Sequence, residues 1–113
     1  MPRLPWSAVG AGLAFALAVA GGRGIANEPQ KLEAAGHAIL AEKCARCHAI
    51  EKTGDSPLAQ APAFRDLHKK YPVANIAEAL AEGIVTGHPD MPSTPFVQDD
   101  IDAIIAYIEA LSR

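Results

Sequence analysis

The sequence has no excess of basic residues and few aromatic ones. Its 113 residues include 10 Lys and Arg against 13 Asp and Glu. Nucleic-acid phosphates are bound by basic faces, so this balance argues against a nucleic-acid partner. With only one Trp, two Tyr and three Phe, a chain this short builds a small core. A disulfide, a metal or a bound cofactor would help to stabilise it.

The chain also lacks an apolar run long enough to cross a bilayer. Residues 8–20, AVGAGLAFALAVA, are apolar and uncharged, but a spanning helix needs roughly 20 such residues. One basic residue, Arg3, precedes this run, and small residues follow it. This arrangement is typical of a signal peptide. An uncleaved anchor or a buried core helix is the alternative.

Two positions are plausible for cleavage, after Ala20 and after Ala26, and we favour the second because polar composition begins at Asn27. We therefore predict a signal peptide over residues 1–26 and one exported, periplasmic domain over residues 27–113, with no firm membrane anchor after cleavage. All 13 acidic residues belong to this domain, which makes it acidic.

No alternating strand pattern longer than four residues and no internal repeat is present, so we predict an all-α fold. Three stretches have apolar residues at the spacing of one helix face, from about Glu28 to Ala45, from about Val73 to Val85 and from about Asp99 to Arg113. Their apolar or small positions are Leu32, Ala35, Gly36, Ile39 and Leu40; Ile76, Ala79, Leu80 and Ile84; and Ile101, Ile104, Ile105, Ile108 and Leu111.

The boundaries of these helices are also indicated. Pro72 precedes the second helix and Gly87 follows it. Three acidic residues crowd the first turn of the last helix, where carboxylates are favourable. Residues 49–72 contain Pro and Gly and read as loop, with one short helix near residues 64–70.

Residues 44–48 read CARCH, the motif that carries the chemistry. On one helical turn Cys44, Cys47 and His48 share a face. Two thiols can then form thioethers with the two vinyl groups of a haem, and the imidazole reaches the iron from the same side. A thioredoxin-like pair lacks its βαβ setting, a zinc site lacks further thiols, and a disulfide across two residues is strained. We predict one covalent haem c, whose apolar plate also supplies missing core.

A second axial ligand should come from elsewhere in the chain. His37 lies in the first helix, too near the attachment motif, and we expect it to be solvated; His68 belongs to an exposed polar run. His88 and Met91 remain, in the stretch GHPDMP. Each precedes a proline and is biased towards extended backbone, so only one of the two should face the iron. The residues themselves leave this choice open.

Taken together, the leader, CARCH, the Met91-Pro92 pair and the two end helices resemble a class I c-type cytochrome, a small exported bacterial monohaem protein. The resemblance covers residues 28–113. It implies the cytochrome c fold, with three main helices around the haem, and a close crossing of the end helices at Gly36 and Tyr107. It also implies that the Pro62 carbonyl accepts a hydrogen bond from the proximal ligand His48, and that Met91 is the distal ligand.

The function implied by this resemblance is electron transfer. With two protein ligands, the iron would have no position for a substrate and would cycle between Fe(II) and Fe(III), so we expect a monomeric electron carrier, not an enzyme. Its partners would be redox proteins, docking near the attachment motif, Lys43, Arg46 and Lys52 and the loop at 87–94. The alternatives are a haem c subunit of a larger dehydrogenase or oxidase, and a sensor or peroxidase with an opened sixth site.

Overall fold

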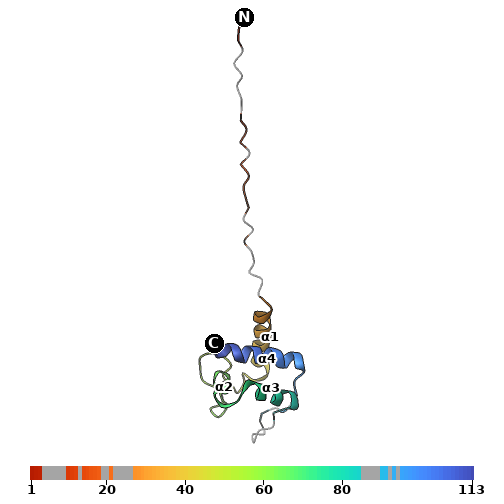
Figure 1. Ribbon diagram of the computed structural model, residues 1–113. Coiled ribbons are helices and arrows are strands. Elements are labelled where there is room, and N and C mark those ends of the chain that lie inside the picture. Colours follow the sequence, from red (N-terminus) through yellow and green to blue (C-terminus); the bar gives the residue numbers. More distant parts are fainter. Residues whose placement is uncertain are drawn as a thin grey trace.

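The computed structural model describes residues 1–3, 10–12, 14–18, 21, 27–84, 90–91, 93 and 95–113. The residues described ahead of Asn27 form no helix or strand and are exposed, outside the helical domain (Figure 1). None of the helices in the described part of the chain has both the length and the apolar character needed to span a membrane.

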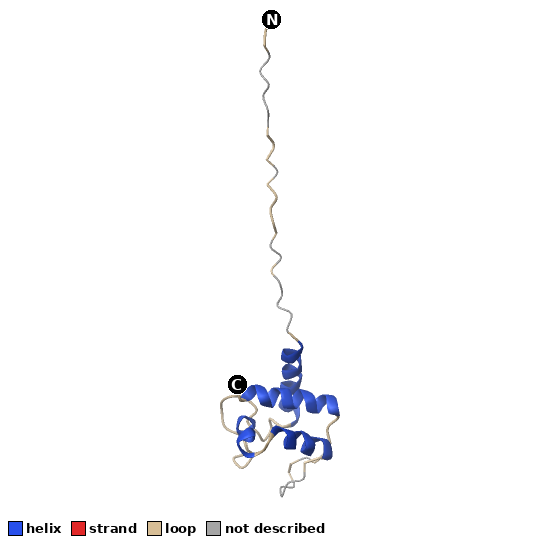
Figure 2. Ribbon diagram, viewed as in Figure 1, coloured by secondary structure: helices blue, strands red, loops and turns tan. Residues whose placement is uncertain are grey.

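The domain is built from helices joined by loops (Figure 2). Its elements are α1 (Glu28–Lys43), the 3-10 helix η1 (Phe64–Asp66), α2 (Leu67–Lys70), α3 (Val73–Glu82) and α4 (Gln98–Leu111). The described ranges contain no strand, and the predicted all-α class is confirmed. The three long helices match the three predicted stretches, and η1 with α2 forms the short helical segment expected at 64–70.

Helix α1 begins with a complete capping box. The Asn27 side chain accepts a hydrogen bond from the Gln30 amide at 3.1 Å, and the Gln30 side chain accepts one from the Asn27 amide at 3.3 Å. Both satisfy amides that have no partner within the helix. The cap fixes the start of α1 and therefore the register in which it reaches the attachment motif.

Helices α1 and α4 cross (Figure 1). Gly36 of α1 lies against Ala103 and Tyr107 of α4 at this crossing. A Cβ atom at Gly36 would lie 2.0 Å from the carbonyl oxygen of Ala103 and 2.9 Å from the Cβ of Tyr107. Only a residue without a side chain permits this approach, as the resemblance predicted. The face of α1 turned to α4 buries Gly36 and Leu40, whereas Leu32 and Ala35 are exposed. Leu32 and Ala35 belong to the predicted apolar stretch but not to the buried stripe, which is narrower and centred on the crossing.

The core lies between α4, the end of α1 and the loop that follows it. Its buried apolar residues are Leu40, Ala49, Ile50, Phe64, Leu80, Ile101, Ala103, Ile104, Ile108 and Leu111. Of the large side chains, Leu40 and Ile104 are each only 1% exposed. Several apolar residues packed against this cluster, among them Leu67, Ile84 and Phe96, are only partly buried. The protein core is small, as expected from the composition.

Helix α3 ends earlier than predicted, at Glu82. Gly83 follows it with a φ of +90°, which L side chains rarely adopt. A Cβ atom on Gly83 would lie 2.3 Å from the carbonyl oxygen of Ser93. This glycine therefore both ends α3 and lets the later chain pass close by. The predicted end at about Val85 was three residues too late, and Gly87, which was expected to follow the helix, lies outside the described residues.

Candidate functional site

The attachment motif forms one turn directly after α1. The amides of Cys47 and His48 both donate to the carbonyl oxygen of Cys44, at 3.1 and 3.0 Å. The Cys44 amide in turn donates to the carbonyl of Leu40, a core residue, at 2.8 Å. The motif thus continues the turn of α1, although α1 itself ends at Lys43. The geometry brings both thiols and the imidazole together at the end of the helix.

The His48 imidazole is oriented by a backbone carbonyl. Its Nδ1 lies 2.7 Å from the carbonyl oxygen of Pro62. Because a carbonyl only accepts, Nδ1 carries the hydrogen and donates it, so in the neutral ring the other nitrogen, Nε2, keeps a lone pair. Imidazoles that bind metals commonly hold their other N–H in this way. The structure therefore contains the contact that the resemblance implied.

The loop between His48 and Pro62 is closed by three further contacts. The Ala49 amide donates to Oγ of Ser56 at 2.9 Å, and the Phe64 amide donates to the carbonyl of Ala49 at 2.9 Å. The Phe64 ring lies against the imidazole of His48, with 4.9 Å between ring centroids. These contacts hold the imidazole between a fixed carbonyl and a buried ring.

The two cysteines are free thiols and are partly buried. Burial raises the pKa of the Cys44 thiol above its ordinary value, while the charge of Lys43 lowers it in part. The thiol of Cys44 is therefore kept in its neutral form. Two thiols on the turn that also carries His48 form a donor set that suits a covalently attached haem.

The proposed distal ligand belongs to the chain that returns from α3 to α4. Met91 is partly buried there. Past it, the Phe96 amide donates to the carbonyl of Leu80 at 2.9 Å, and Gly83 lies against Ser93. The returning chain is thus tied to α3 just after Met91. The competing ligand His88 lies outside the described residues, as does Pro92. His68 is exposed, as predicted.

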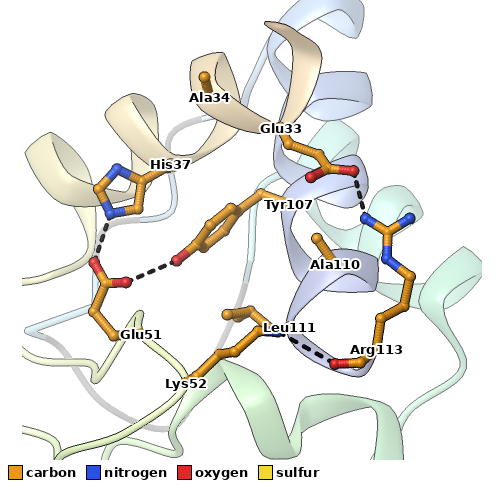
Figure 3. A pocket seen from close by; sticks show the side chains of 9 residues that line it. All are labelled: Glu33, Ala34, His37, Glu51, Lys52, Tyr107, Ala110, Leu111 and Arg113. Atoms are coloured by element: carbon orange, nitrogen blue, oxygen red, sulfur yellow. Dashed lines mark hydrogen bonds and ion pairs between the residues drawn. The ribbon is translucent and has the colours of Figure 1, made fainter. Parts of the chain in front are cut away.

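A second group of side chains lies beside the α1–α4 crossing and includes Tyr107, which takes part in the crossing (Figure 3). Nε2 of His37 lies 2.5 Å from Oε1 of Glu51, and the rings of His37 and Tyr107 form a T-shaped pair with 5.1 Å between centroids. The Tyr107 hydroxyl lies 2.8 Å from the carbonyl oxygen of Ile50 and 3.2 Å from Oε2 of Glu51. His37 was expected to be solvated. Its side chain is 42% exposed, but it also binds a carboxylate 14 residues away, a contact that no local pattern indicates.

Tyr107 should make the free energy of unfolding of the protein fall at alkaline pH. Burial, followed by the nearby Glu51 carboxylate, raises the pKa of Tyr107 to about 12. A raised pKa means that the fold favours the neutral phenol, so its contribution is complete below about pH 10 and is lost as pH rises through about 12. The free energy of unfolding should therefore fall over this range more steeply in the wild type than in Tyr107→Phe, in denaturant titrations at several pH values. Tyr71→Phe, at a residue 52% exposed, should keep the wild-type profile; equal profiles in all three proteins would contradict the assignment.

Within the described residues, no group of three or more His, Cys, Asp and Glu side chains could hold a metal ion. The comparisons with known proteins add one finding. The family described as "Cytochrome C oxidase, cbb3-type, subunit III" matches residues 31–108, most of the chain. No curated protein and no solved structure gave a match. Since the matched range includes both cysteines of CARCH, the chain belongs to this family of c-type cytochromes, as a haem c electron-transfer protein whose Cys44 and Cys47 are present for thioether attachment.

Proposed function

We propose that the protein is a periplasmic monohaem electron carrier whose iron is bound by His48 and Met91, exported by means of a signal peptide over residues 1–26. The hydrogen bond from Nδ1 of His48 to the Pro62 carbonyl carries this proposal. It fixes the tautomer that leaves Nε2 free to bind iron. Bound haem supplies an iron that changes between the ferrous and ferric states.

The chain's own residues would do the remaining work. The thioethers at Cys44 and Cys47 retain the haem, and Met91 supplies a sulfur ligand that favours the ferrous state and raises the reduction potential. If His48 and Met91 both bind the iron, no position would remain on it for a substrate, which supports a carrier over an enzyme. The partly buried residues Leu67, Ile84 and Phe96 offer apolar surface around the core.

The docking face for redox partners is proposed around the attachment motif and the chain near Met91. Lys43 and Arg46 flank or lie within the motif and are exposed. Their charges would speed the encounter with a partner of opposite charge rather than set its affinity, and salt would weaken the effect. Electron-transfer rates measured at increasing ionic strength would show this dependence.

Replacing Met91 should change the spectrum of the ferric protein. We expect Met91→Ala to lose the long-wavelength absorption band that arises from sulfur bound to ferric iron, because no other thioether remains once Met1 leaves with the leader. The matched variant His88→Ala should keep the band at wild-type strength. An absorption spectrum of each purified ferric protein is sufficient. If the band survives in Met91→Ala, the distal assignment is wrong.

The family description favours a second candidate, in which the chain is a haem c subunit of an oxidase. Both candidates transfer electrons through the same haem. They differ in whether the protein is isolated from cells by itself or as part of a complex. Size-exclusion chromatography of the native protein from gently solubilised cells would separate them: elution near the 11.8 kDa of the whole chain or less supports a free carrier, and elution with an oxidase supports a subunit.

A further inference from the structure

Glu51 is held on three sides, although its side chain is largely exposed. Its Oε1 lies 2.5 Å from Nε2 of His37, and its Oε2 lies 3.2 Å from the Tyr107 hydroxyl (Figure 3). The Arg65 guanidinium donates to its carbonyl oxygen at 3.4 Å. The same Tyr107 hydroxyl donates to the carbonyl of the preceding residue, Ile50, at 2.8 Å. Contacts from α1, α4 and η1 therefore converge on one short segment of chain.

This segment leads directly to the proposed proximal ligand by two routes. The first route is the chain itself, in which only Ala49 separates Ile50 from His48. The carbonyl of Ala49 accepts a hydrogen bond from the Phe64 amide at 2.9 Å. Arg65, which binds the Glu51 carbonyl, follows Phe64, and the Phe64 ring lies against the imidazole of His48. A displacement of Ile50 or Glu51 would therefore be transmitted to the imidazole through covalent neighbours and through a packed ring.

The charges around Glu51 leave His37 as its main ionic partner. The titratable and charged groups around it are Glu33 and His37 on α1, Tyr107 on α4, Arg113 just after α4, Arg65 on η1, and Lys52 next to it in the chain. Glu33 and Arg113 form an ion pair with each other, and Lys52 donates to the Arg113 carbonyl at 3.2 Å. The hydrogen bond from His37 is the largest cause that lowers the pKa of Glu51, and burial opposes it.

We propose that His37, Glu51 and Tyr107 form a clasp beside the α1–α4 crossing that positions the His48 imidazole and links proton binding at Glu51 to the reduction potential of the iron. The inference rests on the proposed binding of iron by His48. A carboxylate charge favours ferric over ferrous iron, because the ferric ion is more positive. Taking up one proton removes that charge, so the potential rises as pH falls through the pKa of Glu51. By linkage, adding one electron to the iron strengthens proton binding at Glu51 equally.

The experiment uses the haem-loaded protein and the variants Glu51→Gln and Tyr107→Phe. Gln keeps the size of Glu and one acceptor oxygen but has no charge to titrate. The control is Glu109→Gln, at an exposed carboxylate of α4. The measurements are the reduction potential from about pH 7 to about pH 3, a range that extends below the ordinary Glu pKa because the pKa of Glu51 is lowered, and the paramagnetically shifted NMR signals of the His48 ring.

We expect the potential of the wild type and of Glu109→Gln to rise towards low pH, and that of Glu51→Gln to lose this rise. Tyr107→Phe should shift the His48 ring signals, because Ile50 loses its hydrogen bond. If both variants only lower the free energy of unfolding and leave the pH profile and the ring signals unchanged, the clasp is an ordinary stabilising contact and the proposal is wrong. Absence of His48 ring signals in the wild type would overturn the proposed ligation instead, and the clasp with it.

Discussion

Replacing both Cys44 and Cys47 by Ala should leave the protein without covalent haem and largely without native helix. The core explains this result. Among the described large side chains, only Leu40 and Ile104 are less than 2% exposed, and many of the apolar residues around the core remain partly exposed. A domain this small is marginally stable without a cofactor to extend its core. Far-UV circular dichroism of the purified variant, beside the haem-loaded wild type, measures the loss of helix.

A haem-free wild-type chain is the control for this experiment. It keeps both thiols and differs from the native protein only in the missing haem. If the haem and not the thiols stabilises the fold, the haem-free wild type and the double variant should be equally unfolded. A helical signal of native strength in either chain would show that the core is sufficient by itself, and the prediction would fail.

The long helices were predictable from the sequence because their information is local. Ile101, Ile104, Ile108 and Leu111 repeat at helical spacing, and the same spacing buries them in the structure. The end of α3 was not predictable in this way. Gly83 ends the helix with a positive φ, and because it has no Cβ the carbonyl oxygen of Ser93 lies within 2.3 Å of where a Cβ would be. That neighbour is ten residues further along the chain, beyond the reach of a local pattern.

In the candidate site, too, the contiguous features could be predicted from local sequence and the contacts between distant residues could not. The motif at Cys44–His48 is contiguous, so its chemistry could be predicted from a pentapeptide. The contact between His48 and Pro62 spans 14 residues, and only the family resemblance indicated it. The pair His37–Glu51 spans the same distance and was missed, because a lone helical His beside polar residues has the pattern of a solvated side chain. The resemblance that placed Gly36 and Tyr107 at a crossing could have directed attention to His37, which adjoins Gly36.

Gly36→Ala should destabilise the protein by about 3 kcal/mol, and Gly36→Val by more. Alanine in place of glycine normally stabilises a helix interior by about 1 kcal/mol. Here the added Cβ would lie 2.0 Å from the backbone oxygen of Ala103, which cannot rotate away as a flexible side chain can. Helices α1 and α4 would have to separate, and the packing of Leu40 and Ile104 between them would be lost. A total stability of about 5 to 15 kcal/mol makes such a loss large.

Denaturant titration of the haem-loaded variants measures this effect. The matched control is Ala38→Val, which adds bulk at an exposed position two residues further along α1 and should cost less than about 1 kcal/mol, as expected from helix propensity alone. A clash at the crossing predicts that Gly36→Ala is destabilising although its propensity change is favourable, and that the cost grows from Ala to Val. If Gly36→Ala is instead neutral or stabilising, α1 and α4 do not approach as closely as the structure places them. In that case the clasp formed by His37, Glu51 and Tyr107, which depends on the same crossing, would also have to be reconsidered.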